Sequence, residues 1–311
     1  MDNKILTTTS SFGTADRGPL SELESKGYTV ITNPFSRRLS EEELDSLLTE
    51  YQPCGLIAGV EPITRRVLEK AQEHLRVISR VGVGWDNVDH DAVKEYGMEV
   101  FRTPDAVAPA VVELSIALIF SLARQIALHD RQTRTGSWKK HLGGLVEGKT
   151  LGVVGCGRIG RKLAEKMQCF GTEVCAFDPY VDRDEMTALN IRKTDTIEEL
   201  FRDSDIVSLH LASGKDTRHL VSKNLLALMK PSALIINVAR GDVINEADLS
   251  DVLANNEIAG AALDVFEQEP YEGPLRDFDN VILTPHIGSY AREARIQMER
   301  EAVENLLSAL S

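Results

Sequence analysis

Three short segments in the last quarter of the chain carry side chains that could bind and protonate a small carboxylic acid. Arg240 stands in "NVARGDV", Glu269 in "FEQEP" and His286 in "LTPHIGS". An arginine can bind a carboxylate through two parallel hydrogen bonds, and a histidine can gain or lose a proton near neutral pH. A carboxylate that binds the imidazole would fix its tautomer and favour its protonated form. Together, these residue types favour proton transfer to a 2-keto acid.

Each of the three residues also has an ordinary structural explanation. Arg240 could form a surface salt bridge, Glu269 could be a solvated loop charge, and His286 could cap a turn. A histidine in a turn that contains proline and glycine is usually no more than a solvated or hydrogen-bonded loop residue. The three residues share a function only if the fold brings them together.

The predicted strands give these residues a reason to meet. The apolar runs "ALIINVA", "GAALDV" and "VILTP" end shortly before Arg240, Glu269 and His286. Runs of this kind are typical of strands in a parallel sheet that is covered on both faces. Parallel α/β sheets bind ligands beyond the carboxyl ends of their strands, so the three side chains should converge at one sheet edge.

A glycine pattern upstream indicates a nucleotide-binding turn. Gly155, Gly157 and Gly160 follow the apolar run "TLGVV" and open a helical stretch, and Asp178 ends the next predicted strand. In such a βαβ unit the glycines allow a tight turn, the approach of a pyrophosphate and close packing of the helix on the strand. A carboxylate at position 178 can bind ribose hydroxyls and would repel a 2′-phosphate, which favours NAD(H) over NADP(H). Glycines that serve packing alone are the alternative.

Strand and helix patterns alternate twice along the chain. Between residues 4 and 100, five strand-like runs are separated by polar helical stretches, one of which begins with Ser40 and Glu43 as a capping box. A second alternation, with six strand-like runs, extends from residue 150 to about residue 285, and an amphipathic helix is predicted to follow. The fold class is therefore α/β, with two Rossmann-like or flavodoxin-like domains that each contain a doubly wound parallel sheet.

The composition is that of a soluble protein with an acidic surface. The 311 residues carry a formal net charge of −13, which argues against nucleic acid or an anionic membrane as the main partner. Four scattered cysteines indicate neither a disulfide framework nor a metal site, so a cytoplasmic localisation fits best, and the chain does not begin like a signal peptide. The apolar segment 106–124 is nearly long enough to cross a bilayer. Pro109 and Glu113 interrupt it, which favours a helix buried in a protein core or a subunit interface.

Four ordered motifs resemble those of the D-isomer-specific 2-hydroxyacid dehydrogenase family, especially its phosphoglycerate dehydrogenase branch. They are "VVGCGRIGRKLAEKMQCFG" followed by "FDP", then "NVARGDVINEADL", "GAALDVFEQEP" and "NVILTPHIGS". The segment "SRVGVGWDNVD" in the first third of the chain is similar to the family's substrate loop. The resemblance implies a discontinuous substrate domain, residues 1–101 and 286–311, and an NAD-binding Rossmann domain, residues 102–285. Because the chain ends soon after the final predicted helix, we expect a short form without the added regulatory domain of longer phosphoglycerate dehydrogenases.

The resemblance implies a role for each motif residue. Arg240 would bind the carboxylate and carbonyl of a 2-hydroxy or 2-keto acid, His286 would be the general acid and base, and Glu269 would pair with it. The backbone at Val83 and Gly84 would bind the substrate carboxylate. The residues implied in binding NAD are Gly155, Gly157, Arg158, Ile159, Gly160, Asp178, Thr217, Val238, Ala239, Asp264 and Gly288. No metal is implied.

The sequence departs from the phosphoglycerate dehydrogenase pattern where the substrate tail should bind. The loop "GLIAGVEPIT" lacks the arginine that those enzymes use for the substrate phosphate, and its Glu61 would oppose a phosphate. Arg80 matches a second phosphate-facing arginine, and Lys139 or Lys140 could come from a partner subunit. The candidate substrates are 3-phosphoglycerate, an analogue with a phosphonate or sulfonate tail, and a plainer acid such as glycerate or lactate, with an anionic tail favoured.

Two further expectations concern partners. The resemblance implies a homodimer formed through the helix region 106–124, which would explain a membrane-like helix in a soluble enzyme. An alternative function is NAD(H) sensing by a binding protein on the same fold, as in the related transcriptional corepressors. Such a protein would not need Arg240, Glu269 and His286 together, so their joint presence favours an enzyme.

Overall fold

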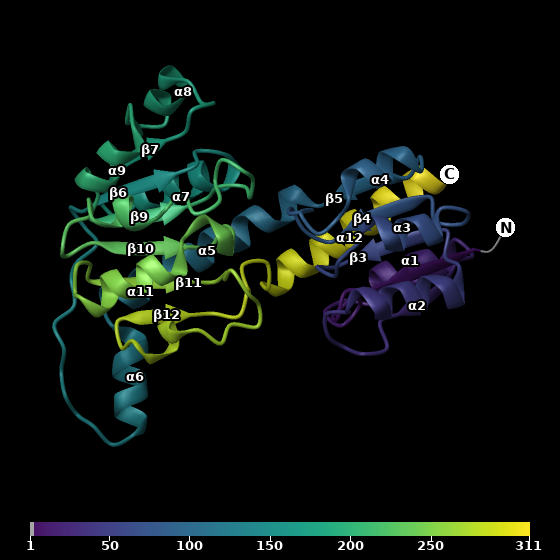
Figure 1. Ribbon diagram of the computed structural model, residues 1–311, viewed down its shortest axis with the longest axis horizontal. Coiled ribbons are helices and arrows are strands. Elements are labelled where there is room, and N and C mark those ends of the chain that lie inside the picture. The colour runs from purple at the N-terminus through teal and green to yellow at the C-terminus, as the bar shows by residue number, and fades with distance from the viewer. Residues whose placement is uncertain (1–2) are drawn as a thin grey trace. The chain divides into compact units, whose positions relative to one another are not determined.

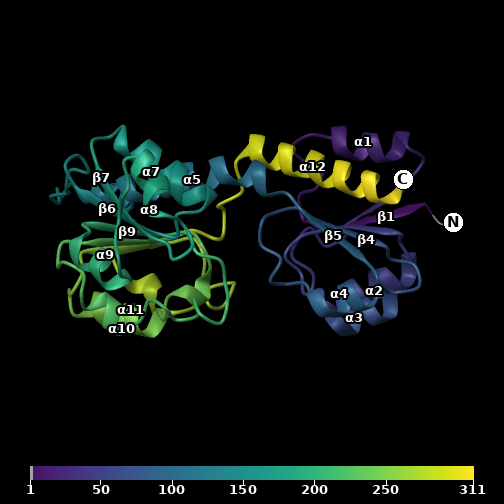
Figure 2. The ribbon, with the colours of Figure 1, turned by 90° about the horizontal axis from the view of Figure 1, so that it is seen from above.

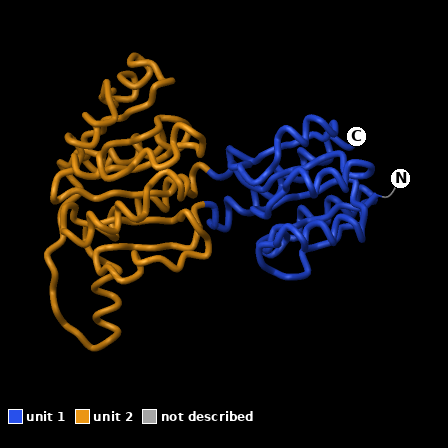
Figure 3. Tube along the Cα trace, in the orientation of Figure 1, with its two compact units in different colours: residues 1–107, 289–311 blue, residues 108–288 orange. Residues whose placement is uncertain are grey.

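The computed structural model describes residues 3–311 and divides the chain into two compact units (Figure 3). Unit 1 contains the N-terminal part of the chain up to Val107 together with Ser289–Ser311, and unit 2 contains Ala108–Gly288. Unit 1 is therefore discontinuous in sequence. The unit boundaries lie a few residues beyond the predicted domain boundaries, so that His286 belongs to unit 2.

Unit 1 is built on a parallel sheet of five strands in the order β2-β1-β3-β4-β5 (Figure 1). The strands are β1 (Lys4–Thr7), β2 (Thr29–Thr32), β3 (Gly55–Ala58), β4 (Val77–Arg80) and β5 (Glu99–Arg102). The helices are α1 (Gly18–Ser25), α2 (Glu41–Tyr51), α3 (Arg65–Ala71), α4 (His90–Glu95) and α12 (Arg292–Leu310). Figure 2 shows α1 and α12 on one face of this sheet and α2, α3 and α4 on the other. The five predicted strands and the predicted final helix are confirmed.

Unit 2 contains a parallel sheet of seven strands in the order β12-β11-β10-β9-β6-β7-β8. The strands are β6 (Thr150–Val154), β7 (Glu173–Phe177), β8 (Arg192–Lys193), β9 (Ile206–Leu209), β10 (Leu234–Asn237), β11 (Gly260–Leu263) and β12 (Val281–Leu283). The helices are α5 (Pro104–Ala123), which begins in unit 1, α6 (Ile126–Arg134), α7 (Arg158–Gln168), α8 (Arg183–Ala188), α9 (Ile197–Asp203), α10 (Lys223–Leu226) and α11 (Glu246–Ala254). Figure 2 shows α5 and α7 on one face and α9, α10 and α11 on the other. The α/β class with two parallel, doubly wound sheets is confirmed.

The differences from the predicted elements have local causes. Only six strands were predicted for the second sheet, because β8 is two charged residues long at the sheet edge and forms no apolar run. By contrast, β3, β9 and β11 are buried at every residue, which explains their apolar sequences. The capping box of α2 is present, with the Ser40 hydroxyl accepting from the Glu43 N–H (3.2 Å) and the Glu43 carboxylate accepting from the Ser40 N–H (2.9 Å).

The long apolar helix α5 could cross a membrane by length and composition alone. Its most apolar window has a mean hydropathy of 2.1, and 56% of that window is buried inside the protein. A core helix of a soluble protein has the same properties. Glu113, which the sequence suggested to be buried, is exposed in the single chain.

Candidate active site

The turn that carries His286 follows β12 and is tied to a buried carboxylate. Asp264 follows β11, is 1% exposed, and accepts hydrogen bonds from the Thr284 hydroxyl (2.6 Å) and from the N–H groups of Ile287 and Gly288 (both 2.8 Å). His286 has a φ of 53°, in the left-handed region that side chains with a β-carbon rarely adopt. The three hydrogen bonds flank the histidine and hold this conformation. Backbone strain that the surroundings maintain in this way is concentrated at functional sites.

The imidazole of His286 is paired with Glu269, as the sequence led us to expect. Its Nδ1 lies 2.9 Å and 3.1 Å from the two carboxylate oxygens. The N–H of Phe266 also donates to this carboxylate (3.2 Å), which ties Glu269 to the loop that follows β11. The histidine side chain is 44% exposed, and Nδ1 is engaged, so Nε2 is the ring nitrogen that can exchange a proton with a small molecule.

Arg240 follows β10 and lies in a turn that Asn237 stabilises. The Asn237 side chain donates to the Arg240 carbonyl (2.9 Å) and accepts from the Ala239 N–H (3.1 Å), while Arg240 Nη1 donates to the Ala239 carbonyl (2.7 Å). At the next residue, Gly241, a β-carbon would lie 1.9 Å from the carbonyl group of Phe266. Only glycine permits so close an approach. The segment that carries Arg240 is therefore packed against the loop that follows β11.

Two glutamates, Glu246 and Glu267, join the same loop to α11. The N–H of Glu267 donates to the Glu246 carboxylate (2.7 Å), and the N–H of Glu246 donates to the Glu267 carboxylate (3.1 Å). Burial raises the pKa of Glu246, and the nearby carboxylates of Glu267 and Glu269 act in the same direction. Glu267 lies two residues before Glu269, so this reciprocal pair of hydrogen bonds holds the loop that carries Glu269. No short motif could have indicated it, because its partners come from separate elements.

Asp264 is also among the residues that the resemblance implies in binding NAD, as are Val238 and Ala239. Its N–H donates to the Asn237 carbonyl (2.9 Å), which brings the ends of β10 and β11 together. Val238 and Ala239 are each 8% exposed. Burial raises the pKa of Asp264, while its hydrogen bonds with the turn and the nearby His286 act to lower it. The structure thus gives Asp264 a contact that the sequence analysis missed, the one with the histidine turn.

The glycine turn meets a different geometric requirement at each glycine. Gly155 has a φ of 92°, and a β-carbon there would lie 2.7 Å from the carbonyl oxygen of His210. At Gly160, inside α7, a β-carbon would lie 2.2 Å from the carbonyl oxygen of Gly155. Gly157 is the N-cap of α7. No atom lies within 4 Å of where its β-carbon would be, which leaves open space at the helix N-terminus. These properties fit a turn that admits a pyrophosphate.

Asp178 follows β7 and is bonded to the glycine turn. Its carboxylate accepts hydrogen bonds from the N–H groups of Cys156 and Tyr180 (both 2.9 Å). Arg158 and Ile159 are the first residues of α7. The carboxylate, the glycines and the helix N-terminus therefore lie together, in the arrangement that binds the ribose and pyrophosphate of a dinucleotide in Rossmann folds.

The segment after β9 borders this turn and contains two further residues of interest. The hydroxyl of Thr217, which was expected to contact NAD, donates to the carbonyls of Ala212 (2.8 Å) and Gly214 (3.2 Å). His210, which was not selected, has its Nε2 2.9 Å from the Ser208 hydroxyl. Burial lowers the pKa of His210 to about 4, so this imidazole is neutral at physiological pH.

The substrate residues expected in unit 1 lie at the end of β4 and in the loop after it. Arg80 is the last residue of β4, and its Nη1 donates to the carbonyl of the following residue. Val83 and Gly84 lie in the loop, which is fastened to Thr103. The N–H of Gly82 donates to the Thr103 hydroxyl (2.8 Å), and the N–H of Thr103 donates to the Gly82 carbonyl (3.0 Å).

Two more charged residues lie at this edge of the unit 1 sheet. Glu61 was expected to oppose a substrate phosphate, but its side chain is 1% exposed and accepts hydrogen bonds from the Thr8 hydroxyl and the Gly59 N–H (3.0 Å). The expectation assumed an exposed carboxylate, whereas the charge is buried and solvated by these donors. Arg102, which the sequence analysis did not select, ends β5 in register with Arg80.

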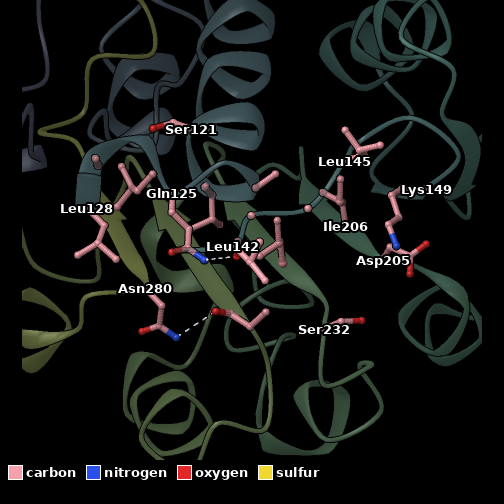
Figure 4. Close-up of a pocket in the computed structure, with 18 of the residues that line it drawn as sticks. Ser121, Gln125, Leu128, Leu142, Leu145, Lys149, Asp205, Ile206, Ser232 and Asn280 are labelled. Carbon is pink, nitrogen blue, oxygen red and sulfur yellow. Dashed lines mark hydrogen bonds between the residues drawn. The ribbon is translucent and has the colours of Figure 1, made fainter. Parts of the chain in front are cut away.

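A cavity of about 420 Å³ in unit 2 lies away from these residues (Figure 4). Its lining includes residues at or just before the amino ends of the strands, among them Lys149, Asp205, Leu234, Ala259 and Asn280. Ligands of parallel α/β sheets bind at the carboxyl ends, so this cavity is not the candidate active site. Among residues 3–311, no group of three or more His, Cys, Asp or Glu side chains could hold a metal ion.

Comparisons of the sequence with known proteins agree with this geometry. Residues 116–288 match the NAD-binding domain of the D-isomer specific 2-hydroxyacid dehydrogenases. The D-3-phosphoglycerate dehydrogenase of Methanocaldococcus jannaschii is 39% identical over 260 residues, which are 83% of this chain and 49% of that protein. The hydroxypyruvate reductase of Thermotoga maritima is 35% identical over 281 residues, which are 88% of this chain and 90% of that protein. The chain thus spans about half the length of the first relative, and similar identities to differently named relatives do not single out the phosphoglycerate dehydrogenase branch.

A solved structure shares the fold over nearly the whole chain. The TT0316 protein from Thermus thermophilus has a TM-score of 0.89 at 33% sequence identity, and the match covers 99% of this chain and 96% of that one. The family match, the relatives and the two parallel sheets lead to the same assignment. The chain belongs to the D-isomer specific 2-hydroxyacid dehydrogenase family of oxidoreductases.

Proposed function

We propose that this protein interconverts a small D-2-hydroxy acid and the corresponding 2-keto acid with NAD(H) as its cofactor. The observation that carries the proposal is the pair of His286 and Glu269, 2.9 Å apart, on a turn that Asp264 holds in place. A histidine whose Nδ1 is bonded to a carboxylate is suited to give or take a proton at Nε2. The turn of Arg240, packed against the neighbouring loop, supplies the cation that a carboxylic acid substrate needs.

The protein residues act on the substrate as follows. When bound, NADH supplies the hydride that the C2 carbon receives. In this direction, protonated His286 donates its Nε2 proton to the carbonyl oxygen as negative charge develops there. Arg240 stabilises that charge and binds the substrate carboxylate, while Glu269 stabilises the imidazolium and holds its orientation. In the oxidising direction, neutral His286 accepts the hydroxyl proton at Nε2.

The residues of unit 2 fit NAD better than NADP. Asp178 is held beside the glycine turn by the Cys156 and Tyr180 N–H groups, where its carboxylate can accept hydrogen bonds from both ribose hydroxyls. A 2′-phosphate at this position would meet a negative charge. We assign Gly288 and Thr217, together with the residues around Val238, to the same cofactor site.

Unit 1 is assigned the role of substrate domain, with the backbone of Val83 and Gly84 binding the substrate carboxylate. Among substrates, we favour an acid of the phosphoglycerate dehydrogenase type, such as 3-phosphoglycerate or a phosphonate or sulfonate analogue. The burial of Glu61 supports this preference because it removes an exposed negative charge from the edge where the tail would bind.

A cytoplasmic homodimer fits the remaining features. The four cysteines at positions 54, 156, 169 and 175 are free thiols, as is usual in a reducing compartment. Large apolar side chains are exposed in and around the connector that follows α5, namely Ile126, Trp138, Leu142 and Leu145. Such side chains mark association surfaces, and sedimentation of the purified protein tests for a dimer.

The function is tested by NADH oxidation with a panel of 2-keto acids. We would compare phosphohydroxypyruvate, phosphonopyruvate, sulfopyruvate, hydroxypyruvate, pyruvate and glyoxylate under identical conditions. Turnover of at least one, with weaker use of NADPH, supports the proposal. Tight NADH binding without turnover of any 2-keto acid would contradict it and favour a binding protein on the same fold.

A further inference from the structure

Two arginines end adjacent strands of unit 1 at the edge where ligands bind. Arg80 ends β4 and Arg102 ends β5, and the two are partners in the parallel register. Register partners in adjacent parallel strands project to the same face of a sheet. Two positive charges therefore occupy neighbouring positions beside the loop that contains Val83 and Gly84.

The guanidinium of Arg102 is held against an aromatic ring. Its central carbon lies 3.9 Å from the centroid of the Trp85 ring, and the ring of His90 packs edge-on against the same tryptophan with centroids 4.5 Å apart. Arg102 Nη1 lies 3.5 Å from the Val83 carbonyl, at the limit of a hydrogen bond. Within residues 3–311, no carboxylate oxygen lies within 4.0 Å of this guanidinium.

This arrangement leaves the bonding edge of the guanidinium available. When the flat face of a guanidinium stacks on an aromatic ring, its N–H groups point outwards in the plane of the guanidinium. There they can bind a carboxylate or phosphate through two hydrogen bonds. A half-buried cation that lacks a carboxylate neighbour is costly unless a ligand supplies the negative charge. The Arg102 guanidinium contacts an aromatic face and one weak backbone acceptor, so the fold does not use its charge in an ion pair.

One carboxylate at this edge, that of Glu61, is buried away from a ligand. The Glu61 carboxylate is 1% exposed and is compensated by the Thr8 hydroxyl and the Gly59 N–H. A buried carboxylate with two donors presents much less of its charge to solvent than a free one. Burial therefore removes the Glu61 charge from the surface that a ligand at these strand ends would meet.

We propose that Arg102, positioned by Trp85 next to Arg80, is the specificity-determining residue that binds a second anionic group on the substrate. The preferred substrate is then a 2-keto acid with a phosphate, sulfonate or carboxylate on a short tail. This inference rests on the proposed dehydrogenase function and adds to it the residue that recognises the tail.

The kinetic test compares two substrates that differ only in the phosphate, phosphohydroxypyruvate and hydroxypyruvate. In Arg102→Gln, kcat/KM for phosphohydroxypyruvate should fall about 10- to 100-fold, which corresponds to the loss of a charge-assisted bond, while that for hydroxypyruvate should change less than about twofold. Arg102→Lys keeps the charge but not the stacked fork, so its loss should be smaller and in the same direction. Oxaloacetate, which carries a carboxylate in place of the phosphate, shows whether other anionic tails depend on Arg102 as well.

A matched control is Arg66→Gln, which removes an arginine on α3 that pairs with Glu41 (2.9 Å). This variant should leave both kcat/KM values unchanged. Equal losses for the charged and uncharged substrates in Arg102→Gln would overturn the inference, because they would mean that Arg102 only positions the loop. Unchanged values for both substrates would overturn it too.

Calorimetric titration distinguishes failure of this inference from failure of the dehydrogenase proposal. In the presence of NAD, wild-type protein should bind 3-phosphoglycerate more tightly than glycerate, and Arg102→Gln should lose that difference. Selective binding that depends on Arg102, without turnover, would sustain the anion site and reject the enzyme. Turnover of uncharged 2-keto acids with no preference for the phosphorylated ligand would reject the anion site and sustain the enzyme.

Discussion

Asp264 in unit 2 and Arg102 in unit 1 lie at the carboxyl ends of their sheets and are held by different means. The Asp264 carboxylate accepts hydrogen bonds from the hydroxyl and N–H groups of the His286 turn. The Arg102 guanidinium contacts the Trp85 ring and lies 3.5 Å from the Val83 carbonyl. The first arrangement fixes backbone geometry, because several short bonds converge on one buried group. The second holds a guanidinium against an aromatic ring, which suits the recognition role proposed for Arg102, whereas the first suits the proposed chemistry of His286.

The largest expected effect lies in unit 2, at His286. Replacing it by alanine removes the proposed acid and base, so kcat should fall about 10³-fold, within the range that general acid–base catalysis contributes. NADH binding, followed by fluorescence, should stay within about twofold of wild type, because Asp264 still holds Ile287 and Gly288. The contrast with Arg102→Gln is the sharpest form of the comparison: one variant should lose turnover of every substrate, the other only the preference for a charged tail. Turnover that survives in His286→Ala would place the acid elsewhere.

The next effect concerns the pH dependence of stability and His210. Burial lowers its folded pKa to about 4 from an ordinary value of 6.5, so the unfolded chain binds more protons between these values. The free energy of unfolding is therefore not reduced by this group above pH 6.5. It falls as the pH falls towards 4, by about 2 kcal/mol at pH 5. Urea unfolding of wild type and His210→Asn at pH 7 and pH 5 measures it, and the variant should lose less stability on acidification. Equal losses in the two proteins would show that His210 does not titrate in this range.

Two glycine substitutions separate folding from cofactor binding within unit 2. A β-carbon at Gly160 would lie 2.2 Å from a backbone carbonyl, so Gly160→Ala should lower the free energy of unfolding by about 2 kcal/mol through overpacking. At Gly157 nothing lies within 4 Å, so Gly157→Ala should fold normally and bind NADH about tenfold more weakly, because its methyl group occupies the space of the pyrophosphate. Thermal unfolding and NADH titration of both variants check this. Similar NADH affinities for Gly157→Ala and wild type would mean that the cofactor does not approach this turn.

The sequence predicted the strands and the residues at their ends, because both depend on short-range patterns. Buried strands such as β9 and β11 are apolar at consecutive positions, and glycine spacing marks the nucleotide turn directly. His286 and Glu269 could be selected since each follows such a strand. The two-residue strand β8 could not be found, because Arg192 and Lys193 show no apolar pattern.

What the sequence could not predict are the partners of these residues across the fold. The bonds from the histidine turn to Asp264 and the reciprocal pair of Glu246 and Glu267 join segments about 20 residues apart, and no periodicity records them. Glu61 was misjudged for the same reason. A glutamate in a loop is normally solvated, and only the structure shows that Thr8 and Gly59 meet it in a buried position. The residue type gives the charge of a side chain, whereas the electrostatic effect of that charge depends on its neighbours in the fold.

The smallest expected effect compares one threonine from each edge. The Thr284 hydroxyl donates to Asp264 (2.6 Å) in unit 2, and the Thr103 hydroxyl accepts from the Gly82 N–H (2.8 Å) in unit 1. Substitution of either residue by valine keeps the shape and removes one hydrogen bond, so each variant should lose about 1 kcal/mol of stability. The kinetic effects should differ. Thr284→Val loosens the turn of the proposed acid and should lower kcat several-fold, whereas Thr103→Val loosens the loop of Val83 and should raise KM for the 2-keto acid with little change in kcat. If both variants changed the same kinetic parameter, the division between a catalytic edge and a recognition edge would not hold, because the two sets of hydrogen bonds would then serve one common conformation.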